Sequence, residues 1–244
     1  MTLSWFEDWV KPLSKDSWNL VLDTLFPLSC VICNQDDNLL CPACQTKFTR
    51  LLRQYCIACG KPSFAGLTHP HCQKPFTPER LFSVLDYHDV NVAKTIIFGK
   101  YHFLPDVYKI LGRLIADNLQ TNLYEHLMKD FRFAAMPLAT SRKRWRGFNQ
   151  AEILCKSLSE IMGKELIHPL ERIKATKTQK DLDRVNRQLN MKDAFNLIDG
   201  ADIQGQNLIL VDDVVTTGAT LLEAAKVLKR KGAGQVWCVT VARD

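Results

Sequence analysis

Four pairs of potential metal ligands, each pair spaced by two residues, crowd into the stretch between residues 30 and 72. All but two of the nine cysteines lie there. The pairs are Cys30 and Cys33, Cys41 and Cys44, Cys56 and Cys59, and His69 and Cys72. Seven thiolates and one imidazole match the needs of two tetrahedral zinc ions. Because a closed set of four protein ligands leaves no open position, the pattern predicts structural zinc rather than catalytic zinc.

Two histidines, His69 and His71, are candidates for the eighth ligand. His71 is adjacent to Cys72 and competes with His69, but only His69 repeats the spacing of the other pairs, so the spacing favours His69. Residues 27 to 79, which hold all these ligands, are rich in Cys, Pro, Gly and polar residues and have no long periodic element. We therefore expect this module to be held together by metal rather than by an apolar core.

The remaining composition is that of a water-soluble protein. The 244 residues are 46% hydrophobic and 24% charged, and no apolar run approaches the roughly 20 residues of a membrane span. The first seventeen residues include Glu7, Asp8 and Asp16 and lack a basic start, which argues against a secretory signal. Crowded cysteines in such a chain are typical of metal ligation in a reducing compartment. We expect a cytoplasmic protein without an integral membrane segment.

The net charge of +6 is unevenly distributed. Residues 1 to 79 carry equal numbers of acidic and basic side chains, so the whole excess follows residue 79. Its densest part is the run from Arg142 to Arg146, which encloses Trp145. A second basic stretch follows, with Arg172, Lys174, Lys177, Lys180, Arg184, Arg187 and Lys192. This excess predicts a phosphate-rich partner, either a small molecule or a nucleic acid, although a solvated basic face is the alternative.

Strand and helix patterns alternate along the second half of the chain. Strands are predicted at 82–87, 131–136, 208–211 and 236–241, and helices at 92–98, 107–127, 150–162 and 220–231. This alternation predicts a three-layer α/β domain with a parallel sheet. Before it, residues 18–26 read as a short amphipathic helix ended by Pro27, for which core packing is favoured over a membrane surface. We divide the chain into an N-terminal extension (1–26), a zinc module (27–79) and the α/β domain (80–244).

The richest chemical pattern follows the apolar run Leu208 to Val211. That run would deliver two aspartates to the carboxyl end of a strand, where α/β sheets bind ligands. A Thr- and Gly-containing turn then leads into a helix N-terminus, whose N–H groups and hydroxyls can hold a phosphate. Gly218 would let the backbone approach that phosphate closely, and the carboxylates would accept hydrogen bonds from ribose hydroxyls. The predicted ribose 5-phosphate site consists of Asp212, Asp213, Val214, Thr216, Thr217, Gly218, Ala219 and Thr220.

Residues 208 to 220 resemble at every position the signature with which type I phosphoribosyltransferases bind phosphoribosyl pyrophosphate (PRPP). Three further stretches resemble the ComF family of competence-related proteins, which includes GntX-like proteins, and the likeness covers roughly residues 18 to 243. They are the cysteine-rich start with its preceding helix; Pro137-Leu138 through Arg142, Arg144 and Arg146-Gly147-Phe148-Asn149-Gln150; and a run with Thr176, Gln179, Leu182, Arg184, Arg187, Asn190, Ala194 and Phe195.

The resemblance implies a type I phosphoribosyltransferase fold preceded by a double zinc ribbon. It implies that residues 135–141, with Pro137 and Leu138, form the pyrophosphate loop, and that a segment between residues 174 and 190 closes over the site. Mg²⁺ would bridge the pyrophosphate and the ribose hydroxyls. The basic neighbours that could offset the charge of the leaving group are Arg142, Arg144 and Arg146. Asp212 and Asp213 are the candidates for a catalytic role.

The chain departs from the family pattern in three places. The fourth ligand pair is His-x2-Cys where most relatives have Cys-x2-Cys, and residues 1–17 have no family counterpart. Ala139 stands where many relatives have histidine, so no imidazole can act as an acid or base there. This last departure leaves turnover itself an open matter.

Two functions fit these features. By resemblance, the protein works in natural competence and DNA uptake: it binds PRPP, contacts single-stranded DNA through the basic run around Trp145, and acts with other competence or DNA-uptake proteins. The alternative is a phosphoribosyltransferase that moves ribose 5-phosphate onto a base, against which no hood for a purine or pyrimidine is evident. A PRPP-sensing regulator without turnover is a third reading.

Overall fold

The computed structural model describes residues 29–121, 124–174 and 191–244. The predicted helix at 18–26, the extension that contains it and the expected closing segment lie outside the described residues. Contacts group the chain into two compact units, residues 1–46 and 47–244. The second set of four zinc-type ligands, from Cys56 to Cys72, therefore shares a unit with the α/β sheet, and the boundary near residue 79 stays a prediction. Within the described ranges, no helix is long and apolar enough to cross a membrane.

The described part of the first unit is a small turn-rich module. The N–H of Asn34 donates to the carbonyl of Cys30 at 2.8 Å, which closes a tight turn between the first two cysteines. The short helix α2 (Pro42–Gln45) follows directly after Cys41 and has proline in its first turn, where no N–H is needed. These two local structures bring the thiols of both cysteine pairs within 4.8 Å of one another.

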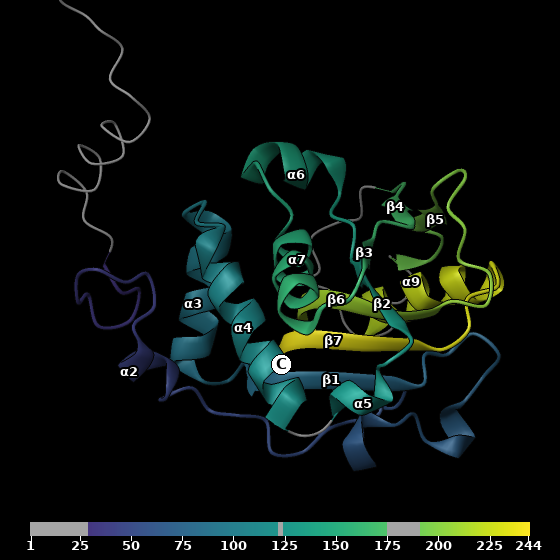
Figure 1. Cartoon of the computed structure of the whole chain (residues 1–244), viewed down its shortest axis with the longest axis horizontal. Helices are drawn as coiled ribbons and strands as arrows, with labels where there is room; N and C mark the ends of the chain where they lie inside the picture. Colours follow the sequence, from purple (N-terminus) through teal and green to yellow (C-terminus); the bar gives the residue numbers. More distant parts are fainter. Residues whose placement is uncertain (1–28, 122–123, 175–190) are drawn as a thin grey trace, which may run out of the picture. The chain divides into compact units, whose positions relative to one another are not determined.

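The second unit is built on a five-stranded parallel sheet (Figure 1). Its order is β1 (Arg80–Asp86), β7 (Val236–Arg243), β6 (Asn207–Val215), β2 (Phe131–Ala135) and β3 (Leu166–Ile167). The two central strands β6 and β7 are apolar and almost wholly buried, as expected for a sheet that is covered on both faces. The predicted three-layer α/β class is confirmed.

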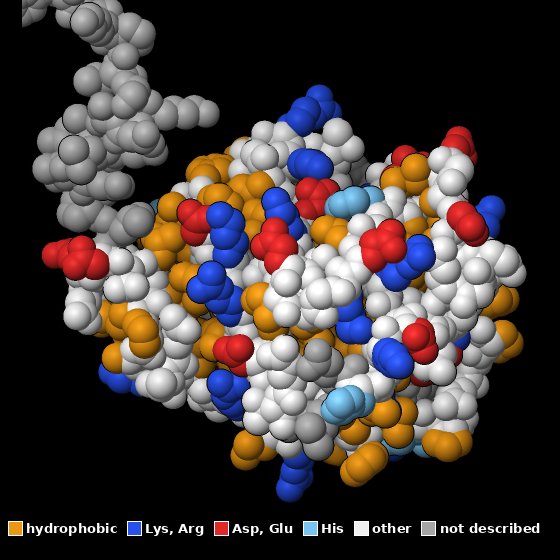
Figure 2. Space-filling model, viewed as in Figure 1, with side chains coloured by type: hydrophobic (Ala, Val, Ile, Leu, Met, Phe, Trp, Pro, Cys, Tyr) orange, Lys and Arg blue, Asp and Glu red, His pale blue; other side chains and the backbone are white. Residues whose placement is uncertain are grey.

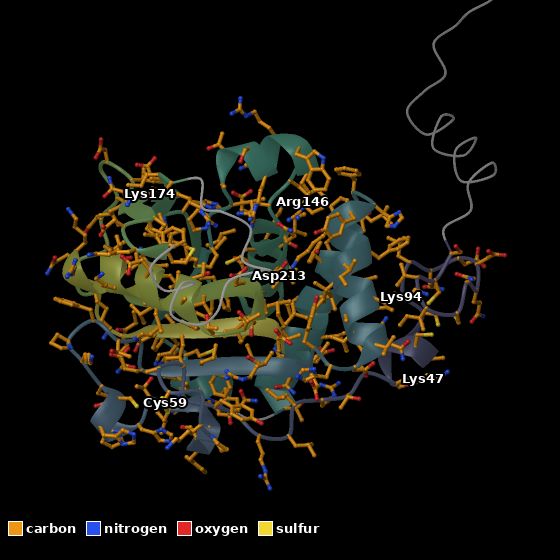
Figure 3. The ribbon with its side chains drawn as sticks, turned by 180° about the vertical axis from the view of Figure 1, so that it is seen from behind. Lys47, Cys59, Lys94, Arg146, Lys174 and Asp213 are labelled. Atoms are coloured by element: carbon orange, nitrogen blue, oxygen red, sulfur yellow. The ribbon has the colours of Figure 1, made fainter. Side chains whose placement is uncertain are left out.

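The helices cover both faces of this sheet. They are α3 (Val90–Tyr101), α4 (Asp106–Thr121), α5 (Tyr124–Leu127), α6 (Thr140–Arg146), α7 (Gln150–Met162) and α9 (Ala219–Arg230). Figure 1 shows α4 and α7 side by side on one face, and Figure 3, from behind, shows α9 on the other. A Cβ on Gly112 of α4 would lie 2.7 Å from the Cβ of Ser157 in α7, so these two helices pack at close range.

Capping residues fix the start and end of α7, which matches its predicted bounds. The Asn149 side chain accepts a hydrogen bond from the N–H of Ala151 and donates one to the carbonyl of Met136 at 2.9 Å. The helix ends at Gly163, whose φ of 61° is left-handed. Because Met136 directly follows β2, the cap of α7 also fixes the loop at the carboxyl end of that strand.

Four features differ from the sequence-based expectations. The helix expected over 107–127 is divided into α4 and α5, with residues 122–123 between them not described. The basic run, for which no element was predicted, forms helix α6, and β4 (Leu170–Arg172) pairs antiparallel with β5 (Phe195–Leu197) in a small second sheet. Finally, β6 continues beyond the apolar run as far as Val215, because β7 pairs with it up to its last residue.

Residues 47–79 run along β1 and belong to its unit. The N–H of Leu51 donates to the carbonyl of Val84, and Thr68 pairs through its N–H with the carbonyl of Glu79. Gln54 makes two further bonds, accepting from the N–H of Ser83 and donating to its carbonyl, both at 2.9 Å. The segment that carries the second set of zinc-type ligands is thus hydrogen-bonded onto the edge strand of the sheet.

Candidate functional site

A cavity of about 660 Å³ opens at the carboxyl ends of β2 and β6, within the size range of ligand pockets. It brings together the phosphate-loop residues, the loop after β2, and side chains of α3 and α6. Its lining consists of Tyr87, Lys100, Tyr101, Met136, Pro137, Leu138, Arg142, Trp145, Arg146, Asn149, Gln150, Arg172, Asp244 and every residue from Asp212 to Leu221. All eight residues of the predicted ribose 5-phosphate site are therefore on its wall.

The phosphate loop turns sharply from β6 into α9. Gly218 is the N-cap of α9 and has a φ of 77°, a left-handed conformation that suits glycine. The Thr217 hydroxyl accepts a bond from the N–H of Ala219 at 3.4 Å, which closes the turn. Three threonines and the first turn of a twelve-residue helix consequently face the cavity, an arrangement that attracts anions.

Gly218 has a neighbour that the sequence did not predict. A Cβ at this position would lie 3.0 Å from Cγ1 of Ile57 and 3.1 Å from the Ile57 carbonyl oxygen. Ile57 is 2% exposed and stands between Cys56 and Cys59. The space beside Gly218 is thus filled by the second metal-binding knuckle, so packing, in addition to any approach of a phosphate, requires glycine here.

The two aspartates differ in their surroundings. Asp213 pairs with Lys100, with 2.8 Å between Oδ2 and Nζ, and its other oxygen accepts the N–H of Val214 at 2.7 Å. Among the side-chain hydrogen bonds of the described residues, the Asp212 carboxylate accepts only one, from the N–H of Asp213 at 2.8 Å. Burial, followed by the negative charge of Asp213, raises the pKa of Asp212 to about 7. One carboxylate is therefore neutralised by a cation while the other can exchange a proton near neutral pH.

Helix α6 separates the basic run into two faces. Arg142, Trp145 and Arg146 line the cavity, because residues three and four apart share one side of a helix. Arg144 points to solvent, and Lys143 pairs with Glu152 at 3.1 Å. Of the three arginines expected beside a pyrophosphate, the structure therefore brings two to the cavity and leaves Arg144 outside.

Arg146 is a buried cation at the cavity wall. Only 8% of it is exposed, its Nε has no hydrogen-bond partner, and no carboxylate pairs with it within the described ranges. Arg172 lies on the same wall, and its pKa is lowered by burial and then by the positive charge of Arg142. Arg142 and Arg172 are only partly buried, but two cations that repel one another at a cavity wall favour an anion between them. Figure 3 marks Arg146 at α6 and Asp213 on the sheet, two of the elements that meet at the cavity.

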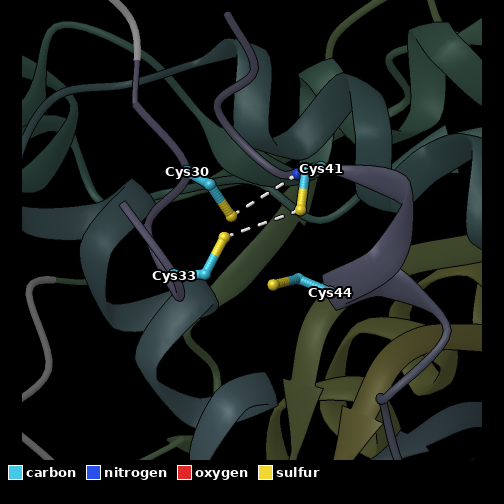
Figure 4. A group of neighbouring side chains, drawn as sticks. All are labelled: Cys30, Cys33, Cys41 and Cys44. Carbon is cyan, nitrogen blue, oxygen red and sulfur yellow. Dashed lines mark hydrogen bonds between the residues drawn. The ribbon is translucent and has the colours of Figure 1, made fainter. Parts of the chain in front are cut away.

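The eight predicted metal ligands form two groups of four, with the ligand atoms of each group within 4.8 Å of one another. In the first, shown in Figure 4, the sulfurs of Cys33 and Cys41 are 3.7 Å apart. In the second, Nδ1 of His69 lies 3.3 Å from the Cys59 sulfur. The eighth ligand is His69, while His71 only stacks on its ring, with 5.3 Å between centroids.

Both groups fit zinc by their chemistry. Cys₄ and Cys₃His are the usual ligand sets of tetrahedral structural zinc. Nε2 of His69 lies 3.1 Å from the carbonyl oxygen of Pro62, the kind of outer contact that fixes the tautomer of a zinc-binding imidazole. The two clusters indicate two structural zinc sites.

The sequence reasoning missed several residues on the cavity wall. Lys100 and Tyr101 end α3, Tyr87 follows β1, and Asp244 is the last residue. None of them belongs to a motif, and each lies far along the chain from the phosphate loop. In the sheet, only β7 separates β1 from β6, and α3 follows β1 in the chain. Only this order could have suggested that the end of α3 reaches the edge at which the phosphate loop lies.

Two protein families match successive parts of the chain. Residues 147–244 match the phosphoribosyl transferase domain family, and residues 21–74 match the double zinc ribbon domain family. Among solved structures, a hypoxanthine phosphoribosyltransferase from Staphylococcus aureus is 13% identical, with a TM-score of 0.38 over 56% of this chain and 65% of its own.

Two curated proteins are similar over most of the chain. The DNA utilization protein YhgH of Escherichia coli strain K12 is 34% identical over 210 residues, which span 82% of this chain and 89% of that protein. The competence protein ComFC of Bacillus subtilis strain 168 is 29% identical over 216 residues, 85% of each chain. The protein therefore belongs to the ComF/YhgH family, with a phosphoribosyltransferase domain and an N-terminal double zinc ribbon.

Proposed function

We propose that this protein binds PRPP in the cavity at the end of β6 and serves the handling of incoming DNA, contacting single-stranded DNA through α6. The observation that carries the proposal is the convergence of three groups on one cavity. These are the Thr216–Thr220 loop at the N-terminus of α9, the carboxylates of Asp212 and Asp213, and the buried guanidinium of Arg146. A phosphate, two ribose hydroxyls and a pyrophosphate need these three kinds of group.

Each group has one task in this proposal. The N–H groups of the loop hold the 5-phosphate. Asp213 accepts a hydrogen bond from a ribose hydroxyl once Lys100 moves from Asp213 toward the incoming anion. Arg142 and Arg146 offset the charge of the pyrophosphate. Mg²⁺ would be held mainly by the ligand, because it keeps several waters and binds few protein carboxylates. The double zinc ribbon acts as scaffold, since its four-ligand groups leave no position for a substrate.

Calorimetric titration with PRPP and Mg²⁺ tests the phosphoribosyl part. Asp213→Asn should weaken PRPP binding about tenfold or more, because charge-assisted hydrogen bonds contribute roughly 1.5–3 kcal/mol, while inorganic phosphate affinity stays unchanged. Asp117→Asn, at an exposed position of α4, is the matched control and should bind PRPP like the parent protein. Failure of the folded parent protein to bind PRPP would refute this part.

The DNA part rests on the solvent face of α6 and on the named activities of the relatives. Arg144→Ala should lower the slope of log affinity against log salt by about 0.7 per lost phosphate contact, and leave PRPP binding intact. The control Arg113→Ala, at an exposed position of α4, should leave the slope unchanged. If the protein binds no oligonucleotide at low salt, the proposed direct contact with DNA is refuted.

A transferase that moves ribose 5-phosphate onto a base is the second candidate. It is favoured by one observation: Asp212 has a pKa raised to about 7 inside the cavity, which suits a group that donates or accepts a proton. Release of pyrophosphate from PRPP in the presence of a panel of bases, lost in Asp212→Asn, would favour this candidate over binding alone.

A further inference from the structure

The cavity wall carries a lysine whose backbone is fixed by packing. Lys100 lies in the last turn of α3 and lines the cavity. Its neighbour Gly99 packs against α4 so closely that a Cβ would lie 2.9 Å from Cε2 of Tyr108. Tyr108 is fully buried, and its hydroxyl donates to the carbonyl of Ile96 at 3.1 Å. The end of α3 is therefore held against α4, while the long side chain of Lys100 can still turn about its own bonds.

The ammonium group of Lys100 occupies Asp213. Its Nζ lies 2.8 Å from Oδ2 of Asp213, and Oδ1 accepts the N–H of Val214 at 2.7 Å, so each carboxylate oxygen has a partner. The two side chains are only 22% and 13% exposed, which limits the screening of the pair by water. The pair of Lys143 and Glu152 is 52% and 36% exposed, and Figure 2 shows other Lys and Arg side chains beside Asp and Glu side chains at the surface. Separating Lys100 from Asp213 therefore costs more than separating such surface pairs.

A ribose hydroxyl that donates to Asp213 has to compete with this ammonium group. A hydrogen bond to a carboxylate that keeps its full charge contributes more than one to a carboxylate that a cation neutralises. The ammonium can leave Asp213 at little cost only where another anion takes it up, because a largely buried cation without a partner is unfavourable. Recognition of ribose by Asp213 is therefore weak unless the ligand brings an anion within reach of Lys100.

The end of α3 lies beside the part of α6 that would hold a pyrophosphate. The ring centroid of Tyr101, the residue after Lys100, is 5.9 Å from that of Trp145 in α6. Two arginines of α6 line the cavity together with Lys100. Under the proposed function, those arginines offset the charge of the pyrophosphate, while the 5-phosphate is held at the start of α9. The pyrophosphate is therefore the anion that can take up the ammonium group of Lys100.

We propose that Lys100 determines the specificity of the site: it keeps Asp213 paired until a pyrophosphate group draws its ammonium away. The inference rests on the proposed function, because the cavity must hold a phosphoribosyl ligand. Ribose 5-phosphate lacks the pyrophosphate and meets a paired Asp213, whereas PRPP releases the carboxylate for its own ribose hydroxyl. The site consequently prefers PRPP over ribose 5-phosphate by more than the direct contacts of the pyrophosphate.

The first test is calorimetric titration of the zinc-loaded full chain with inorganic phosphate, ribose 5-phosphate and PRPP, each with Mg²⁺. Asp213→Asn should lower PRPP affinity about tenfold but ribose 5-phosphate affinity by less than about twofold, because the carboxylate is already paired when ribose 5-phosphate binds. PRPP and ribose 5-phosphate carry the same two ribose hydroxyls. Equal losses for these two ligands would therefore overturn the inference.

The second test removes the ammonium group. The ratio of ribose 5-phosphate affinity to inorganic phosphate affinity measures what the ribose contributes. Lys100→Met should raise this ratio about tenfold while it lowers PRPP affinity, because Asp213 is then open from the start. A lysine that only attracts anions or supports the fold would not raise the ratio when it is lost. Addition of Asp213→Asn to Lys100→Met should return the ratio to the parent value.

The control for the lost charge is Lys94→Met. Lys94 lies on the same helix at an exposed position outside the cavity lining and is labelled in Figure 3, and its loss should leave the ratio and PRPP affinity unchanged. If the folded parent protein does not bind PRPP, the proposed function fails and the inference fails with it. If PRPP binds but Lys100→Met leaves the ratio unchanged, the inference is refuted while the proposed function stands. Should Lys100→Met fail to fold, the titrations of Asp213→Asn decide the matter alone.

Discussion

The contact between Gly218 and Ile57 makes the stability of the phosphate loop depend on the second zinc knuckle, and substitution by alanine can measure this. Gly218 has a φ of 77° and Gly200 a φ of 79°, so alanine should suffer similar backbone strain at both, about 1–2 kcal/mol. A Cβ at Gly200 meets nothing within 4 Å, whereas one at Gly218 meets Ile57. Gly200→Ala is therefore a control matched in backbone conformation.

The difference between the two variants follows from the distances. Cγ1 of Ile57, at 3.0 Å, can move by a change of rotamer, but its carbonyl oxygen, at 3.1 Å, moves only with the knuckle backbone. Overpacking of this kind costs about 1–3 kcal/mol. We expect Gly218→Ala to lower the free energy of unfolding by about 2–5 kcal/mol and Gly200→Ala by about 1–2 kcal/mol.

Denaturant unfolding of the zinc-loaded protein measures both values. The combination of Gly218→Ala with Ile57→Ala should be less destabilising than the sum of the single changes, because the smaller side chain relieves the contact with Cγ1. Phosphate affinity should fall in Gly218→Ala and not in Gly200→Ala. Equal losses of stability in the two glycine variants, with additive behaviour of the double variant, would show that the knuckle does not support the loop.

Three further predictions concern charge and metal. Lys100→Met should destabilise the protein by about 3 kcal/mol in thermal melts, because it leaves Asp213 buried without its cation. Lys109→Met breaks an exposed ion pair and should have little effect, so equal losses of stability in the two variants would refute this prediction. Since the pKa of Asp212 is raised from 3.8 to about 7, the folded protein keeps a proton that the unfolded chain releases, so the free energy of unfolding should fall as the pH rises from about 4 to about 7. Asp212→Asn should make this fall smaller, and the same pH dependence of stability in the variant and the parent protein would contradict the prediction. Metal analysis should find two zinc ions per chain in the parent protein and in His71→Ala, but only one ion in Cys44→Ser or in Cys59→Ser. Of these two cysteine variants, only Cys59→Ser should speed amide exchange in the Thr216–Thr220 loop.

The parts of the fold that sequence predicted are those in which local chemistry and tertiary structure agree. The bounds of α7 follow from an Asn cap and a Gly end that act within a few residues. The two sets of zinc-type ligands follow from spacing, because two intervening residues place a pair of thiols on one turn. The site loop follows from an apolar strand, two carboxylates and a helix start in direct succession.

The parts that sequence could not predict depend on contacts distant along the chain. Lys100 reaches Asp213 from a helix that precedes it by more than a hundred residues, and nothing near Lys100 marks it as a cation of the site. β4 and β5 are three residues each, too short for an alternating pattern. Ile57 looks like any apolar residue of a zinc knuckle until the fold sets it against Gly218.

Helix α6 is the clearest case of local geometry deciding function. In an extended run, side chains alternate, so Arg142, Arg144 and Arg146 would lie on one side and Lys143 on the other. Wound into a helix that ends at Gly147 with a φ of 80°, the run turns Arg142 and Arg146 toward the cavity and Arg144 toward solvent. Under the proposed function, Arg142 and Arg146 neutralise the small anion inside the cavity, while Arg144 contacts the strand outside it. Trp145 lines the cavity and is also half exposed to solvent.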